Sequence, residues 1–186
     1  DHMDTYGHDF ERLKSTFVEF LEHLPFYGLA VLCNDDPHVR SVASRLTRPV
    51  ATYAIAEPAD LMAHEVIADG TCMRFTAVAT SGDLPALDIT LNLPGVHNVR
   101  NALAAAAVGY ALDVPPDTIA RALGAFHAPK GRLQRCEGLH GSTLIDDTYN
   151  ANPDSSLAAI AVLAALPGKR ILVLGDMGEL GDQGGE

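Results

Sequence analysis

The chain has 186 residues, of which 47% are hydrophobic and 20% charged, and this composition excludes a disordered protein. Its formal net charge is −11 with no cluster of Lys and Arg, so nucleic acid is not an expected partner. The most apolar run, residues 102–112, is too short to span a bilayer, so no membrane association is expected. Three widely spaced cysteines suit reduced thiols better than a disulfide framework or a zinc site, which predicts a cytoplasmic location.

The first half of the chain has the pattern of an α/β protein. Residues 9–24 place apolar side chains at three- and four-residue steps behind Asp9, and predict a helix with this residue as N-cap. Residues 28–34 and 49–55 are expected to be strands on either side of a helix that begins near Pro37. Three further strand-like stretches, separated by the turn signals ADG and SGD, predict an antiparallel meander; they are residues 61–68, 72–80 and 87–93.

The second half continues with helices and shorter strands. Two helices are expected at 97–112 and 116–126, and a boundary between domains at 128–133. Beyond that boundary the pattern predicts two paired strands, a helix and a buried parallel strand, in residues 131–139, 142–150, 152–166 and 169–177.

The stretch DDTYNANPDS, residues 146–155, is more polar than a turn requires. In an open α/β sheet, ligands gather at the carboxyl ends of strands, where loop amides and helix N-termini converge. The side chains expected at such an end are Asp146, Asp147, Tyr149, Asn150 and Asn152. The alternative is an ordinary loop in which Asn152 or Asp154 caps the next helix and the neighbours are solvated.

A second polar cluster lies in LPGVHNVRNALAAAA, residues 93–107. His97, Asn98 and Asn101 stand three and four residues apart at the start of an Ala-rich helix, so two of them can share a face. Amide side chains can pair with the edge of an adenine, although Asn98 could instead be an N-cap. Arg132 could pair with phosphate or ribose, or be a solvated surface charge.

Together these stretches resemble the Mur ligase family. Residues 1–37, and more broadly the chain to about residue 100, resemble the member that adds L-alanine to UDP-N-acetylmuramate. From about residue 130 onward, DDTYNANPDS and LGDMGELG resemble the member that adds D-alanyl-D-alanine to the UDP-N-acetylmuramoyl tripeptide. The first member would show Arg-Arg-Phe at residues 132–134 and Gly-His-His-Pro at 150–153, whereas this chain has Arg-Leu-Gln and Asn-Ala-Asn-Pro. Both members share LNLPGVHNVRNALAAAA, so a chimera or a fragment is expected.

The resemblance implies an α/β fold made of two partial domains. Residues 1–130 would be part of a central ATPase-type domain, with βα units, antiparallel strands and two helices. Residues 131–186 would be the first half of a Rossmann-like C-terminal ligase domain. No G-x-x-x-x-G-K-[ST] phosphate loop occurs in the 186 residues, and no UDP-binding domain is expected. We therefore expect no turnover by this chain alone, and self-association through uncovered sheet edges.

The resemblance also implies a reaction and its residues. Mur ligases use ATP and Mg²⁺ to form an amide bond through an acyl phosphate, joining a UDP-N-acetylmuramoyl substrate to an amino acid or dipeptide. By position, His2 matches the magnesium ligand, and Asp176 and Glu179 match the LGDMGELG signature of the member that adds D-alanyl-D-alanine. The matching cofactor-binding residues are His97, Asn98, Asn101, Arg132, Asp147, Tyr149 and Asn152, and the matching catalytic residues are Arg132, Asp147 and Asn150. The alternatives are a non-catalytic nucleotide-binding module and a related amide ligase of the folylpolyglutamate or cyanophycin type.

Overall fold

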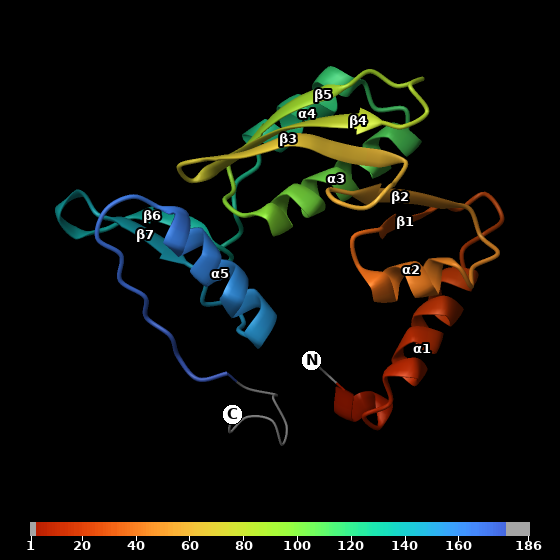
Figure 1. Ribbon diagram of the computed structural model, residues 1–186, viewed down its shortest axis with the longest axis horizontal. Helices are drawn as coiled ribbons and strands as arrows, with labels where there is room; N and C mark the ends of the chain where they lie inside the picture. Colours follow the sequence, from red (N-terminus) through yellow and green to blue (C-terminus); the bar gives the residue numbers. More distant parts are fainter. Residues whose placement is uncertain (1–2, 178–186) are drawn as a thin grey trace.

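The computed structural model describes residues 3–177 (Figure 1). It begins with a 3₁₀ turn, η1 (Met3–Tyr6), and helix α1 (Phe10–Glu22). Asp9 is the N-cap of α1, because its Oδ1 accepts hydrogen bonds from the amides of Glu11 at 2.9 Å and Arg12 at 3.1 Å. The helix and its cap predicted from the sequence are therefore confirmed.

A five-stranded mixed sheet forms the larger part of the molecule. Its strands lie in chain order, with β1, β2 and β3 parallel and β3, β4 and β5 antiparallel. Helix α2 (Pro37–Ala43) lies between the first two strands in sequence, and Pro37 occupies its first turn. The strand bounds are β1 (Ala30–Cys33), β2 (Val50–Ala54), β3 (Leu61–Asp69), β4 (Cys72–Ala79) and β5 (Leu87–Leu91), which confirms the βα unit and the meander.

Two helices cover this sheet and close the core. Helix α3 (Val96–Ala111) packs across β1 to β4, and α4 (Pro116–Ala125) packs against β5. Val99 and Leu103 of α3 are fully buried, and alternate residues of β4 and β5 point into the same core. The buried face of α3 is rich in alanine, with Ala102, Ala106 and Ala107 turned towards the sheet.

The last described part of the chain is a smaller group of elements at one end of the molecule (Figure 1). Strands β6 (Gln134–Glu137) and β7 (Thr143–Asp146) form an antiparallel pair, joined through the 3₁₀ turn η2 (Leu139–Gly141). Helix α5 (Pro153–Ala165) follows. The predicted strand pair and helix are confirmed. Across residues 3–177, no helix combines the length and the apolar character needed to cross a membrane.

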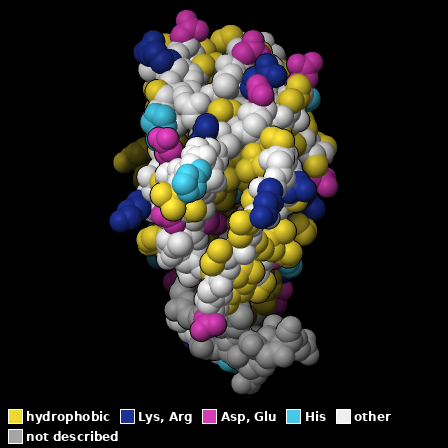
Figure 2. All heavy atoms as spheres, turned by 90° about the vertical axis from the view of Figure 1, so that its left-hand side faces the viewer, with side chains coloured by type: hydrophobic (Ala, Val, Ile, Leu, Met, Phe, Trp, Pro, Cys, Tyr) yellow, Lys and Arg dark blue, Asp and Glu magenta, His cyan; other side chains and the backbone are white. Residues whose placement is uncertain are grey.

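The predicted buried strand at residues 169–177 is wrong. Residues 169–177 contain no strand, and Ile171 and Val173 are 72% and 87% exposed. The guanidinium of Arg170 donates to the carbonyls of Ala164 and Leu166, at 2.8 Å and 3.2 Å, and holds the chain at the end of α5. A buried parallel strand needs a neighbouring strand beside it, and β6 and β7 pair only with each other in the described part of the chain. Figure 2 faces the end of the molecule that carries β6, β7 and α5, and hydrophobic side chains gather on this surface.

Candidate functional site

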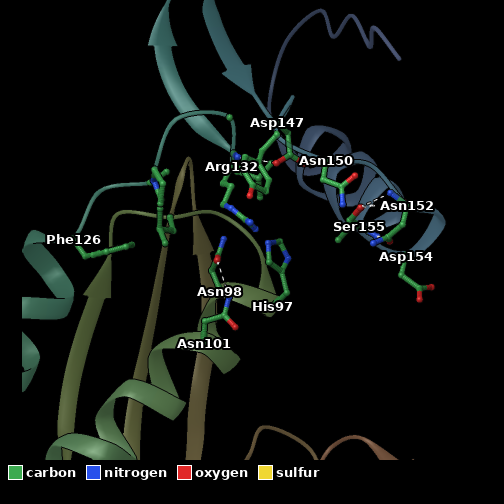
Figure 3. A pocket seen from close by; sticks show the side chains of 17 residues that line it. His97, Asn98, Asn101, Phe126, Arg132, Asp147, Asn150, Asn152, Asp154 and Ser155 are labelled. Atoms are coloured by element: carbon green, nitrogen blue, oxygen red, sulfur yellow. Dashed lines mark hydrogen bonds between the residues drawn. The ribbon is translucent and has the colours of Figure 1, made fainter. Parts of the chain in front are cut away.

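A cavity of about 630 Å³ lies between the N-terminal tip of α3, the linker that follows α4, and the loop between β7 and α5 (Figure 3). Its volume is in the usual range for small-molecule and cofactor sites. Both polar clusters found in the sequence face it, although 45 or more residues separate them along the chain. The predicted residues that line it are His97, Asn98, Asn101, Arg132, Asp147, Tyr149, Asn150 and Asn152.

The tip of α3 carries two amide side chains that bond to each other. Nδ2 of Asn101 donates to Oδ1 of Asn98 at 3.4 Å, and Nδ2 of Asn98 donates to the carbonyl of Pro94 at 2.7 Å. The N-cap of the helix is Gly95, which makes no side-chain cap bond, so the alternative that Asn98 is the N-cap is wrong. The two amides are instead held as a pair, with Asn101 exposed at the cavity.

His97 is held in place by the backbone just before it. Gly95 has φ of +92°, a conformation that side chains rarely adopt, and a Cβ there would lie 2.6 Å from Cε1 of His97. Burial lowers the pKa of His97, and the positive charge of Arg100 acts in the same direction, while the carboxylate of Asp147 opposes both. The His97 imidazole therefore loses its proton at a lower pH than the imidazole of an exposed histidine does.

The linker between α4 and β6 is tied to the loop after β7 by backbone contacts. The amide of Tyr149 donates to the carbonyl of Gly131 at 3.0 Å, and Oδ1 of Asp147 accepts from the amide of Leu133 at 2.9 Å. Gly131 has φ of +74°, and a Cβ there would lie 3.0 Å from the amide nitrogen of Tyr149. Leu133 also has a positive φ, +50°. This conformation places Asp147 and Tyr149 at the cavity.

Arg132 lies between these two tied linker residues. Its guanidinium carbon is 4.1 Å from the centre of the Tyr149 ring, which is a cation–π contact. In Figure 3 its side chain extends from the linker towards His97 and Asn98 at the tip of α3. Arg132 is exposed, and its cationic group lies over the Tyr149 ring at one wall of the cavity.

The asparagines of the second cluster have different structural roles. Oδ1 of Asn152 accepts from the amide of Ser155 at 2.8 Å, and the Ser155 hydroxyl accepts from the amide of Asn152 in a reciprocal capping box. The capping interpretation is therefore confirmed for Asn152, which also lines the cavity. Asn150 is exposed, and its Oδ1 accepts from the amide of Ala151 at 2.9 Å.

The remaining predicted residues lie away from this cavity or outside the described part of the chain. Asp176 is exposed and does not line the cavity. His2 and Glu179 lie outside residues 3–177. Within those residues no three His, Cys, Asp or Glu side chains are grouped so that they could hold a metal ion.

The sequence interpretation missed the apolar wall of the cavity. Leu93, at the end of β5, and Phe126, just after α4, both line it. Asp154 and Ser155, in the first turn of α5, line the opposite side. Phe126 could have been found from its place, because it is a large aromatic side chain at the last residue of the predicted helix 116–126, next to the predicted domain boundary at 128–133.

The fold is α/β, with a cavity between the five-stranded mixed sheet with its helices and the following group of β6, β7 and α5. Residues 1–109 match the Mur ligase middle domain, and residues 131–186 match the Mur ligase, glutamate ligase domain. The chain therefore belongs to the Mur ligase family.

Three similar proteins illustrate this membership. The UDP-N-acetylmuramate–L-alanine ligase of Aromatoleum aromaticum is 48% identical over 183 residues, covering 93% of this chain and 39% of the relative. The structure of MurF from Acinetobacter baumannii matches with a TM-score of 0.83 and 30% identity, over 94% of this chain and 37% of that one. MurF from Thermotoga maritima, solved in complex with ADP, matches with a TM-score of 0.79 and 26% identity, over 94% and 39%. The chain thus spans about two fifths of the length of these relatives.

Proposed function

We propose that this chain forms the adenine-nucleotide-binding part of an ATP-dependent ligase that joins an amino acid or dipeptide to a UDP-N-acetylmuramoyl substrate. One observation carries the proposal: the seven predicted cofactor-binding residues and the predicted catalytic residue Asn150, which come from three separate stretches of the chain, line one cavity. The cytoplasmic location predicted from the reduced cysteines is part of the proposal. ATP, when bound in such ligases, supplies the phosphoryl group that activates a carboxylate for attack by an amine.

The chemical groups around the cavity suit an adenine nucleotide. The paired amides of Asn98 and Asn101 offer both donors and acceptors to the edge of an adenine. The ring of Tyr149 offers a stacking surface, and the Asp147 carboxylate can accept a hydrogen bond from a ribose hydroxyl. The Arg132 guanidinium can neutralise phosphate charge, as it would in the proposed catalytic role. The relative from Thermotoga maritima, which binds ADP, supports this assignment.

The identity of the incoming amine belongs to the proposal as well. The Aromatoleum aromaticum relative, an L-alanine ligase, matches 93% of the chain, so this match extends well past residue 130. The stretch DDTYNANPDS and the match to MurF instead support D-alanyl-D-alanine. We propose that the chain combines features of both ligases, as a chimera would. In this proposal Asn150 and Asn152 stand where the amine approaches the nucleotide.

The proposal is tested by saturation-transfer NMR with ADP on the purified chain. We expect the adenine and ribose protons to receive saturation at millimolar ADP, because the cavity contacts the nucleoside but the chain lacks a phosphate-loop motif. Arg132→Ala and Asn101→Ala should weaken the transfer. Arg121→Ala removes an exposed arginine from α4 and is the matched control. No transfer to adenine, or equal effects of the Arg132 and Arg121 substitutions, would refute the proposal.

The second candidate function is a non-catalytic nucleotide-binding module. It is favoured by the fact that the cavity is formed entirely within the described chain. Calorimetric titration with ATP and Mg²⁺ separates the two candidates. Micromolar binding by the chain alone indicates a module, and weak or undetectable heat indicates a part of a ligase that needs further phosphate contacts.

A further inference from the structure

Asp35 is a nearly buried carboxylate at the carboxyl end of β1, and its side chain is only 8% exposed. It accepts hydrogen bonds from three consecutive backbone amides, those of Ile55 at 3.0 Å, Ala56 at 2.9 Å and Glu57 at 3.1 Å. These amides directly follow β2. Asp35 therefore joins the ends of two neighbouring parallel strands.

The same carboxylate reaches helix α3. Nε of Arg100 donates to Oδ2 of Asp35 at 2.8 Å, and the Arg100 side chain is 40% exposed. Burial raises the pKa of the Asp35 carboxyl, but the hydrogen bonds from Arg100 and the loop amides outweigh it and lower the pKa to about 2. The carboxylate is therefore charged at neutral pH, and Arg100 is held by a charge-assisted bond.

Arg100 lies within the short stretch of α3 that carries His97, Asn98 and Asn101. Successive residues of an α-helix are rotated by about 100°, so fixing the direction of one side chain fixes the directions of its neighbours. The start of α3 has no side-chain N-cap that could fix this rotation, since its N-cap is a glycine. The bond from Arg100 to Asp35 supplies a side-chain anchor at that end of the helix.

We propose that Asp35 and Arg100 form a clamp that positions His97, Asn98 and Asn101 at the nucleotide cavity. Neither clamp residue lines that cavity, so both act as positioning residues and not as ligands. The inference rests on the proposed nucleotide-binding function, and it extends that function to residues on the two strand ends. Arg100 instead lines a second, smaller cavity of about 300 Å³ on the other side of His97.

The clamp is tested in the full chain with Arg100→Leu, Arg100→Lys and Asp35→Asn. The matched control is Arg74→Leu, which removes an exposed arginine that pairs with Asp69 at 3.4 Å elsewhere on the sheet. We expect Arg100→Leu and Asp35→Asn to weaken ADP binding about tenfold, by analogy with the lower end of the loss seen when a residue that orients a metal-binding side chain is removed. Arg74→Leu should leave binding unchanged. The double variant should bind no more weakly than either single variant, because both remove one interaction.

A second measurement, NMR of the side chains of His97, Asn98 and Asn101, reports their positions and needs no nucleotide. Arg100→Lys keeps the positive charge near His97 but replaces the Nε donor, so a change in the NMR titration of His97 reports a moved ring and not a lost charge. His97 also faces Asp147, which is unchanged in this variant. We expect Arg100→Lys to shift the His97 pKa and the side-chain amide resonances of Asn98 and Asn101, and Arg74→Leu to shift neither. Should Arg100→Leu fail to fold, this lysine variant decides the question.

The outcomes separate the clamp from the proposed function. If the wild-type chain shows no contact with adenine, the nucleotide function fails, and the resonances of His97, Asn98 and Asn101 still test the clamp. If the wild-type chain binds ADP and a folded Arg100→Leu variant binds equally well, the clamp is overturned. Unchanged resonances in Arg100→Lys would overturn it as well.

Discussion

Substituting Gly95 by alanine should both destabilise the chain and move His97 out of the cavity. Gly95 has φ of +92° and ψ of 141°, and a methyl group there would lie 2.6 Å from Cε1 of His97 and 3.0 Å from Cγ2 of Val162. Real Cβ atoms do not approach other atoms so closely, so the backbone or these side chains must shift. Because Val162 belongs to α5, the substitution also pushes that helix away from the tip of α3.

The magnitude has two parts. A non-glycine residue held in such a backbone conformation costs about 1–3 kcal/mol. Forcing a methyl group into a packed contact costs a further 1–3 kcal/mol or so. We therefore expect the free energy of unfolding to fall by roughly 2–6 kcal/mol, with the lower values if the His97 ring turns aside.

Urea denaturation measures this loss, and Gly82→Ala is the matched control. Gly82 also has a positive φ, +71°, but a Cβ there would meet nothing within 4 Å. The control should therefore show only the backbone cost, about 1–2 kcal/mol. Equal losses in the two variants would refute the steric contact between Gly95 and His97. An unshifted His97 ring resonance in a folded Gly95→Ala chain would refute its role in placing the ring.

Two further predictions concern pH and association. The pKa of Asp35 is lowered from 3.8 to about 2 on folding, so its contribution to the free energy of unfolding is present above about pH 4 and is lost as the pH falls towards 2. Urea denaturation at several pH values measures this loss. Asp35→Asn should remove up to about 2 kcal/mol of the acid-dependent change. Phe20 of α1 is 69% exposed and β1 is an edge strand of the described sheet, so light scattering should show concentration-dependent dimers that Phe20→Glu weakens. The control is Leu139→Glu, at a site that is 83% exposed and lies in η2, and a monomer at all concentrations would contradict the prediction.

Local signals predicted most of the elements. Asp9 and Pro37 mark the starts of two helices because each makes a specific local contribution, a cap and a fixed φ, that does not depend on distant residues. The strand expected at residues 169–177 failed for the opposite reason. Its apolar pattern is suitable, but a strand exists only where another strand offers hydrogen bonds, and a single sequence does not reveal that partner.

The candidate site was predictable only in part. His97, Asn98 and Asn101 are visible because polar side chains at the start of an Ala-rich helix are unusual, and Asp147 is visible because it follows a strand. That these residues share a cavity depends on how the linker folds, with positive φ at Gly131 and Leu133, which local patterns do not give. Asp35 lies between a predicted strand and the helix that begins near Pro37, and only the packing of α3 against β1 and β2 reveals its bond to Arg100.

The cavity has walls from two groups of elements that the linker joins, so its width depends on how those groups are oriented. A ligand that touches both walls must favour the orientations in which both contacts form. A second molecule that binds better to one orientation of β6, β7 and α5 relative to α3 will change the affinity for that ligand. By thermodynamic reciprocity, the ligand changes the affinity for the second molecule by the same factor. Arg135, which donates to the hydroxyl of Thr71 at 3.2 Å across the two groups, is one place where such a restriction already exists.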